Sequence, residues 1–284
     1  IKPISVFFAM SIATTIYTNM DNVMLGFIKG TTENGYYDAA VKIKNILVSF
    51  VSSLGTVLLP RVSYYIETGE KEEFSRITKK ALNFVFLLSV PLCVYFIIFA
   101  RPSIYLLSGT MFENSILPMR LIMPTLVFIG LTNIIGLQIL VPLGKENQVL
   151  YSEIAGAVVN IIVNMFLIPR MGAAGAAIGT VLAEIMVFIV QVYALKDVVV
   201  KILKKISYWK IAIALVLASF VSVWVNSMNW GNFLILLFSA LLFFGVYVLT
   251  LIIFREKLVK EILDDMLRIV KKNKGNSSGR KGYE

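Results

Sequence analysis

The sequence predicts an all-α, polytopic transmembrane helix bundle of about eight spans. Of its 284 residues, 58% are hydrophobic and 15% are charged, whereas soluble domains are about half apolar and about a quarter charged. Apolar runs of about twenty residues recur along the chain, and each is long enough to cross a hydrocarbon core of roughly 30 Å as a helix. The runs are continuously apolar, unlike barrel strands, whose residues alternate over about ten positions.

The predicted spans are bounded by charged, glycine-containing or proline-containing segments. They cover approximately residues 3–28, 36–59, 82–100, 115–142, 149–168, 172–195, 209–226 and 232–254. In the fourth span, Pro124 is expected to kink the helix. In the sixth, Gly175, Gly179 and Ala183 form a small-xxx-small ridge, which lets membrane helices approach closely.

The distribution of lysine and arginine predicts the orientation, because positively charged short loops stay on the cytoplasmic side of a membrane. With both ends on one side, that side holds 21 of the 27 basic residues, the other side holds three, and three lie within spans. The sequence therefore predicts a multi-pass protein of the bacterial inner membrane with both ends cytoplasmic. The net charge of +10 is explained by loops beside anionic lipid headgroups, so no nucleic-acid partner is expected.

The predicted external connections are too short to contain a catalytic domain. The chain has no histidine, its one cysteine is Cys93, and the external connections are short. We therefore expect no catalytic residues, no metal site and no cofactor. On the cytoplasmic side, residues 61–81 are expected to form a charged connection that contains a short helix, either a solvated linker helix, which is favoured, or one lying on the membrane surface. Residues 196–210 are expected to form a basic connection between subdomains.

The second span carries a polar stripe, because Asp38, Lys42, Asn45 and Ser49 recur at spacings of three or four. In one interpretation Asp38 and Lys42 neutralise each other and the other polar residues mediate helix packing. In the other, the stripe lines a hydrated cavity. Lys44 is expected on a different side of the helix.

Other polar residues lie deep in predicted spans, where charges are costly and mark functional sites by default. The first span contains Tyr17, Asn19 and Asp21, and Asp21 has no cationic neighbour in sequence, so it pairs with another helix or titrates. The fourth span contains Arg120. The fifth carries a polar face, and the sixth has Glu184 near its middle, where a buried partner or a proton site is expected. That polar face comprises Glu153, Gly156, Asn160 and Asn164.

Three segments together resemble the polysaccharide repeat-unit flippases of the Wzx type. They are YTNMDNVMLGFIKGTTENGYYDAAVKI, LLPRVSYY and NIIVNMFLIPRMGAAGAAIGTVLAE. These flippases belong to a superfamily that includes multidrug extruders and lipid II flippases. The resemblance implies that residues 1–195 form one six-helix lobe of a MATE-like fold, here the second of two. It further implies that residues 196–254 contain a basic connection and two extra spans, that residues 255–284 are a basic cytoplasmic tail with a disordered end, and that the first lobe is absent.

The resemblance also implies a substrate, an undecaprenyl-pyrophosphate-linked oligosaccharide turned from the inner to the outer leaflet for surface polysaccharide assembly. Lys42 and Arg120 would bind the diphosphate, and Tyr17, Asn19, Asn45 and Asn160 would bind the glycan. Protonation or ion binding at Asp21 and Glu184 would couple transport to a gradient. Expected partners are this lipid-linked glycan, membrane lipids and the polymerase and chain-length machinery.

Rival functions remain open on these residues. Lipid II translocation shares the diphosphate chemistry. A multidrug extruder would favour an acidic, aromatic cavity, against which Lys42 and Arg120 weigh mildly. A membrane polymerase or acyltransferase is disfavoured by the short external loops and the lack of histidine. A scaffold acting through the basic tail would depend on residues 255–284.

Overall fold

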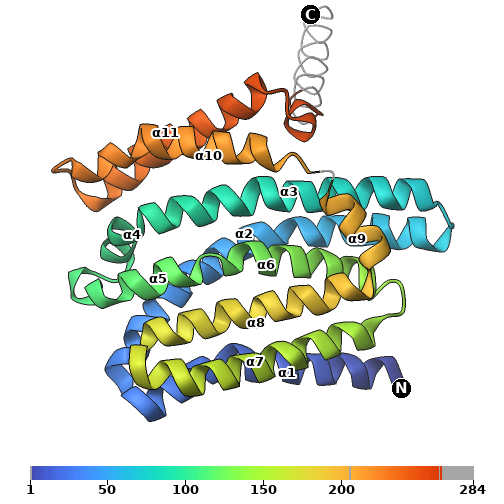
Figure 1. Cartoon of the computed structure of the whole chain (residues 1–284), viewed down its shortest axis with the longest axis horizontal. Helices are drawn as coiled ribbons and strands as arrows, with labels where there is room; N and C mark the ends of the chain where they lie inside the picture. The colour runs from blue at the N-terminus through green and yellow to red at the C-terminus, as the bar shows by residue number, and fades with distance from the viewer. Residues whose placement is uncertain (1, 205, 262, 264–284) are drawn as a thin grey trace, which may run out of the picture.

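The computed structural model describes residues 2–204, 206–261 and 263. Throughout these residues the chain forms long helices joined by short turns (Figure 1), which confirms the all-α, polytopic prediction. In chain order the elements are α1 (Lys2–Lys29), α2 (Thr31–Glu67), α3 (Lys71–Ile98), α4 (Ala100–Leu107), the 3₁₀ helix η1 (Thr110–Ser115), α5 (Ile116–Ile122), α6 (Thr125–Thr132), the π-helix η2 (Asn133–Leu140), α7 (Glu146–Met171), α8 (Ala173–Ala194), α9 (Lys196–Leu203), α10 (Tyr208–Ser222), the 3₁₀ helix η3 (Val223–Ser227) and α11 (Asn232–Ile253).

Among the described residues, five helical segments are long and apolar enough to cross a membrane, and a bent pair makes a sixth. The five are Lys71–Ile98, Glu146–Met171, Ala173–Ala194, Tyr208–Ser227 and Asn232–Ile253, and the pair is Thr110–Ile122 with Thr125–Leu140. These six coincide with six of the predicted spans. The other two predictions, 3–28 and 36–59, coincide with α1 and α2, which belong to the same bundle but are not among the six.

The predicted kink at Pro124 is confirmed. The two halves of this span are bent by 47° at a break between Ile122 and Thr125. Proline lacks the amide hydrogen that would continue the helix, and its ring crowds the preceding turn. The bend is followed by the π-helical stretch η2, so this span is irregular over much of its length.

The predicted connection at 61–81 is wrong in its extent: residues 71–81 are helical, as expected, but they begin α3 and do not form a separate short helix. Helix α2 continues through Pro60 to Glu67, and α3 begins at Lys71, so the link is three residues around Gly69, whose φ is +73°. Hydropathy locates the point where a helix leaves the hydrocarbon, and a helix can continue into water beyond that point. The charged residues of this region therefore extend two long helices.

The basic segments gather at one end of the bundle. In Figure 1 the N-terminus, the α2–α3 turn and α9 all lie at the right-hand end, whereas α4 lies at the left-hand end. Helix α9 is docked on the bundle, because Val199 and Ile202 are buried in the same core as Ala81 and Leu140. The predicted connection at 196–210 thus contains a helix that packs on the bundle.

Close packing of α7 and α8 confirms the interpretation of the small-residue ridge. A methyl group added at Gly175 would lie 2.5 Å from the Leu167 carbonyl oxygen, so the two helices approach too closely for a side chain there. Helices α10 and α11 pack on the outside of α3, where the Tyr95 hydroxyl donates to the Leu236 carbonyl at 2.9 Å. This placement leaves α1, α2, α7 and α8 to form a polar interior of their own.

Candidate functional site

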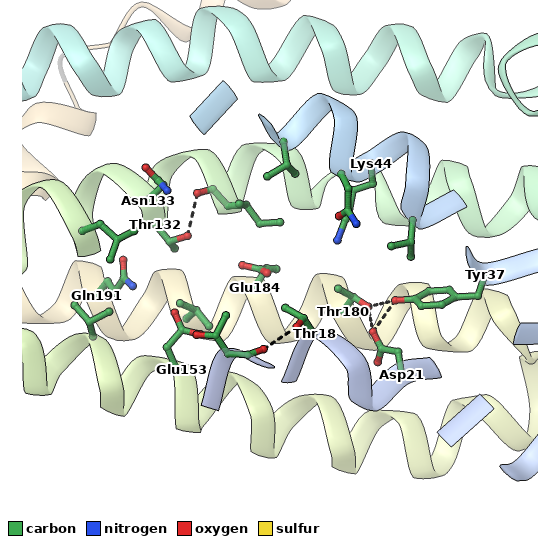
Figure 2. A pocket seen from close by; sticks show the side chains of 18 residues that line it. Thr18, Asp21, Tyr37, Lys44, Thr132, Asn133, Glu153, Thr180, Glu184 and Gln191 are labelled. Carbon is green, nitrogen blue, oxygen red and sulfur yellow. Dashed lines mark hydrogen bonds between the residues drawn. The ribbon is translucent and has the colours of Figure 1, made fainter. Parts of the chain in front are cut away.

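The carboxylate of Asp21 lies at the centre of a buried hydrogen-bond cage (Figure 2). Asp21 is 2% exposed. Its Oδ2 accepts from the Tyr37 hydroxyl at 2.6 Å and from Thr180 Oγ1 at 2.7 Å. Its Oδ1 accepts from Asn160 Nδ2 at 2.9 Å and Asn164 Nδ2 at 2.5 Å. Four donors match the roughly four acceptor sites of a carboxylate, so the charge is held without a cationic partner in hydrogen-bond contact.

Four helices supply this Asp21 cage, and each contributes for a local reason. Asn160 and Asn164 lie one turn apart on α7, and Asn164 Nδ2 also donates to Asn160 Oδ1 at 3.1 Å. Thr180 on α8 reaches the carboxylate because α8 packs so close to α7: a methyl group at Gly179 would lie 2.0 Å from Asn164 Oδ1. That oxygen is buried and has no hydrogen-bond partner among the described residues.

The beginning of α8 is fixed by a side chain from α2. Glu33 Oε2 accepts from the Ala173 amide at 2.9 Å, which caps the first turn. Gly172, with φ of +55°, makes room for that carboxylate, because a methyl group there would lie 2.2 Å from Glu33 Oε2. The cap holds α2 and α8 together at the same end of the bundle as Asp21.

A polar cavity of about 320 Å³ extends from the cage along the bundle interior. Asp21, Tyr37 and Thr180 line one end, Lys44 and Glu184 line its middle, and Thr132, Asn133, Glu153 and Gln191 line the other end (Figure 2). Thr18 on α1 and Asn45 on α2 line the cavity and are also exposed. The cavity therefore opens between α1 and α2.

The charge of this cavity is predominantly negative. Three carboxylates, those of Asp21, Glu153 and Glu184, line it together with one ammonium group, that of Lys44. Glu184 and Asp21 are the charges that act on Lys44. A cavity with an excess of carboxylates attracts cations and repels a diphosphate.

The structure brings some of the predicted site residues together. Asp21, Glu184 and Asn45 line the same cavity, and Asn160 binds Asp21 directly. Asn160 is fully buried, so it belongs to the Asp21 cage and offers no surface to a glycan.

Other predicted residues lie elsewhere. Lys42 is exposed on α2 and outside the cavity lining, whereas Lys44, expected on a different side, lies in it. The cavity side of α2 consists of residues 37, 41, 44, 45 and 48, so it is rotated from the predicted stripe and shares Asn45 with it. The roles of Lys42 and Arg120 in binding stay predictions.

Arg120 and Asn19 are exposed and bond to nearby carbonyls. Arg120 Nε donates to the Ile97 carbonyl at 3.2 Å, on the α3 side of α5. Asn19 Nδ2 donates to the Thr15 carbonyl at 2.8 Å, within α1. The side chain of Tyr17 lies outside the described residues.

Sequence reasoning missed several residues of this site, among them Tyr37, Lys44, Thr180 and Gln191. Asn164 was expected only as part of a polar face. Thr180 lies one turn before Glu184, and a search for polar residues at that spacing in the sixth span would have found it. Tyr37 gives no such signal, because a tyrosine near the start of a membrane helix is also typical of an interfacial residue.

The chemical groups around Asp21 determine which ligand the cage could bind. Among the described residues there is no group of three or more acidic, cysteine or histidine side chains that could hold a metal ion. One carboxylate surrounded by neutral amide and hydroxyl groups suits a proton or a singly charged hard cation, for which oxygen ligands are preferred.

The family model described as lipid II flippase MurJ matches residues 4–244. An uncharacterized membrane protein of Methanocaldococcus jannaschii is 27% identical over 89% of this chain and 50% of its own length. A putative O-antigen transporter of Escherichia coli is 23% identical over 63% of this chain and 43% of its own. A probable flippase for low-salt glycan biosynthesis of Haloferax volcanii is 22% identical over 92% and 55%.

Two solved structures show the same fold. A lipid II flippase MurJ in an inward closed conformation superposes with a TM-score of 0.76 at 18% identity, over 89% of this chain and 53% of that one. An outward-facing MATE multidrug transporter gives 0.56 at 18% identity, over 86% and 62%. The chain thus spans about half the length of the curated relatives it matches, and the predicted resemblance to this superfamily is confirmed.

Proposed function

The chain belongs to the family of the lipid II flippase MurJ, and we propose that it acts in turning an undecaprenyl-pyrophosphate-linked oligosaccharide from the inner to the outer leaflet. The observation that carries this proposal is the match of the family model to residues 4–244, and the acidic cavity that opens between α1 and α2 is the proposed site of a coupling ion. Relatives named as an O-antigen transporter and a glycan flippase support the lipid-linked glycan as the substrate class.

The cavity is proposed to be the site of ion coupling. Asn160 and Asn164 now turn amide nitrogen atoms toward Asp21. Rotation of both amides by half a turn would present two carbonyl oxygens beside the carboxylate and Thr180 Oγ1, giving a small cation four oxygen ligands. Protonation of Asp21 would instead turn an acceptor into a donor. Either event changes the hydrogen bonds that join α1, α2, α7 and α8, and a ligand that prefers one arrangement shifts the population toward it.

The exposed polar face of α1 and α2 is proposed to meet the substrate. Lys42 and Asn45 on α2 and Asn19 on α1 are exposed in helices that also carry apolar lipid-facing surface. Polar side chains facing hydrocarbon are costly, so this face suits a hydrated central space. The ammonium of Lys42 would bind diphosphate oxygens there. We therefore propose that cations bind in the cavity and that the anionic substrate binds on the exposed face of α1 and α2.

The orientation follows the positive-inside rule. We infer the bacterial cytoplasmic membrane, with the N-terminus, the α2–α3 turn and α9 on the cytoplasmic side. Polysaccharide polymerase and chain-length machinery remain proposed partners. Lipid II is the second candidate substrate, because the matching family model bears that name and both substrates carry the same diphosphate.

Translocation in liposomes tests the proposal. The protein is reconstituted with a polyprenyl-diphosphate oligosaccharide labelled on its glycan, and a glycosidase added outside measures the fraction moved. We expect transfer that depends on an imposed sodium or proton gradient. Lipid II is measured in parallel, and faster transfer of lipid II would assign that substrate instead. No transfer of either lipid under any gradient would refute the proposal.

Two charged residues provide a matched comparison, with Lys42→Gln on the exposed face and Glu184→Gln in the cavity. We expect Lys42→Gln to raise the substrate concentration needed for half-maximal transport, by about tenfold for the loss of one charge-assisted hydrogen bond of about 1.5 kcal/mol. The gradient dependence should stay unchanged. Glu184→Gln should alter the gradient dependence and leave the apparent substrate affinity unchanged. The reverse pattern would exchange the two roles.

A further inference from the structure

A second polar cavity lies where the appended helix pair meets the lobe. It has a volume of about 280 Å³ and lies between the first part of α3 and the segment that follows α11. The first part of α3 lies towards the right-hand end of the bundle in Figure 1. Asn83 Nδ2 donates to Glu256 Oε1 at 3.1 Å, and Glu256 Oε2 accepts from the Val259 amide at 2.9 Å. Glu256 thereby caps the segment after α11 and holds it against α3.

The side chains that line this cavity carry an excess of two positive charges, which the pairing of Arg76 with Glu73 outside the lining reduces to one. Arg76, Lys79, Lys80 and Lys257 line it together with two carboxylates, those of Glu256 and Glu261. Lys80 pairs with Glu261 at 2.8 Å, and Arg76 pairs with Glu73 outside the lining.

Two of these cations have room for a ligand. Within the described part of the chain, neither Lys79 nor Lys257 has an ion-pair partner. Glu256 is buried and already hydrogen-bonded, so it does not supply that partner by direct contact. The two ammonium groups therefore face a cavity that lacks one negative charge.

Neighbouring aromatic residues place this cavity at the level of lipid headgroups. Tyr208 and Trp209 begin α10 and are 46% and 56% exposed. Tyrosine and tryptophan concentrate at the membrane–water boundary. Lys210 Nζ donates to the Phe254 carbonyl at 2.8 Å, which ties the start of α10 to the end of α11 at the same level.

We propose that this cavity binds the phosphate of an anionic phospholipid in the cytoplasmic leaflet. A phosphodiester carries the single negative charge that the cavity lacks, and basic cavities between membrane helices on the cytoplasmic side suit such headgroups. A bound headgroup would contact Lys79 of the lobe and Lys257 beyond α11. It would thus join the appended pair to the lobe. This inference is independent of the transported substrate.

Lipid binding by the purified chain in detergent tests the proposal. Phosphatidylglycerol is titrated against phosphatidylcholine, and the bound lipid is counted by native mass spectrometry. The variant Lys79→Gln with Lys257→Gln should bind phosphatidylglycerol about 30-fold more weakly, from about fivefold for each lysine near a lipid surface. The matched control is Lys196→Gln with Lys201→Gln, which removes two exposed lysines of α9 at the same end of the bundle and should change binding by less than about twofold, since neither lysine lines the cavity.

A third variant separates a lost ligand contact from a damaged fold. Glu261→Gln removes the carboxylate that pairs with Lys80 and should tighten phosphatidylglycerol binding several-fold, which a misfolded protein would not do. Inorganic phosphate and soluble glycerophosphoglycerol are added as competitors. Competition by either at the concentration of the lipid would assign the site to a free phosphate. Equal losses in the two lysine variants, or equal binding of phosphatidylcholine, would overturn the proposal.

Discussion

Asp21 illustrates how a membrane helix holds a carboxylate without a direct cationic partner. A charge at mid-bilayer costs about 2.5 to 3.5 kcal/mol on insertion scales. Hydrogen bonds to a charged group each contribute about 1.5 to 3 kcal/mol, and Asp21 accepts four from Tyr37, Thr180, Asn160 and Asn164. The cage therefore offsets the cost of the charge.

Removal of that charge should abolish ion-dependent stability. For Asp21→Asn we expect a melting temperature that no longer responds to sodium or protons. In the unsubstituted chain, an ion at 100 times its Kd should stabilise the fold by about 2.7 kcal/mol. The measurement is thermal unfolding of purified protein in sodium, potassium or choline salts, each over a range of pH.

The control for this prediction is Asn133→Ser, at the far end of the same cavity. It should keep the full ion response, since Asn133 does not contact Asp21. A full ion response in Asp21→Asn would show that the ion binds elsewhere. In the unsubstituted chain, a melting temperature that responds to protons but not to sodium would identify the proton as the coupling ion.

At the scale of single residues, the sequence singled out Asp21 and the two asparagines that bind it, and it missed the other two partners, Tyr37 and Thr180. Asp21 and Glu184 are recognisable because a charge deep in an apolar run is unusual whatever surrounds it. Tyr37 and Thr180 are ordinary residues for membrane helices, and they become partners of Asp21 through contacts separated by 16 and 159 positions. Those contacts depend on how four helices are arranged, which local periodicity does not encode.

The arrangement of α7 and α8 depends on small residues, and it fixes the geometry of the cage. Gly179→Ala should displace Asn164, because the added methyl group would lie 2.0 Å from Asn164 Oδ1. We expect a loss of about 1 to 3 kcal/mol, typical of overpacking, together with a weaker ion response. Thermal unfolding with and without the ion measures both effects.

Gly26→Ala on α1 is the matched comparison, because nothing lies within 4 Å of the methyl group that it adds. This substitution should be neutral or stabilising by about 0.5 to 1 kcal/mol, since alanine favours a helix over glycine. A loss of stability as large as that of Gly179→Ala would mean that the α7–α8 contact is not the cause of the loss in Gly179→Ala, because the effect of alanine on the unfolded chain is to stabilise the fold.

Helix α2 shows that the sequence predicted a helix but not the side of it that faces the cavity. Its existence and its polar character followed from the sequence, but the side of the helix that faces the cavity did not. Residues at spacings of three or four define two overlapping stripes, one through Lys42 and one through Lys44, and both contain Asn45. Packing against α1 and α8 selects the second stripe for the cavity and leaves Lys42 exposed.

For the whole molecule, the sequence predicted the helix bundle, the kinked fourth span and the gathering of charge at one end. It did not predict how far α2 and α3 extend beyond the membrane. The grouping of basic segments makes the orientation testable, since Lys201 on α9 and Met111 in η1, which follows α4, are exposed at opposite ends of the bundle.

Labelling from one side of the membrane tests this orientation directly. Cys93 is the one cysteine in the sequence and is buried, so Cys93→Ser gives a background without thiols. In intact cells stripped of their wall, a membrane-impermeant maleimide should label Met111→Cys and spare Lys201→Cys, because basic loops stay inside. Inside-out vesicles should reverse the pattern. Labelling of Lys201→Cys from outside would show that the topology is the opposite of the one proposed. The phospholipid cavity beside α3 would then lie in the outer leaflet, and the α1–α2 face would receive its substrate from the opposite side of the membrane.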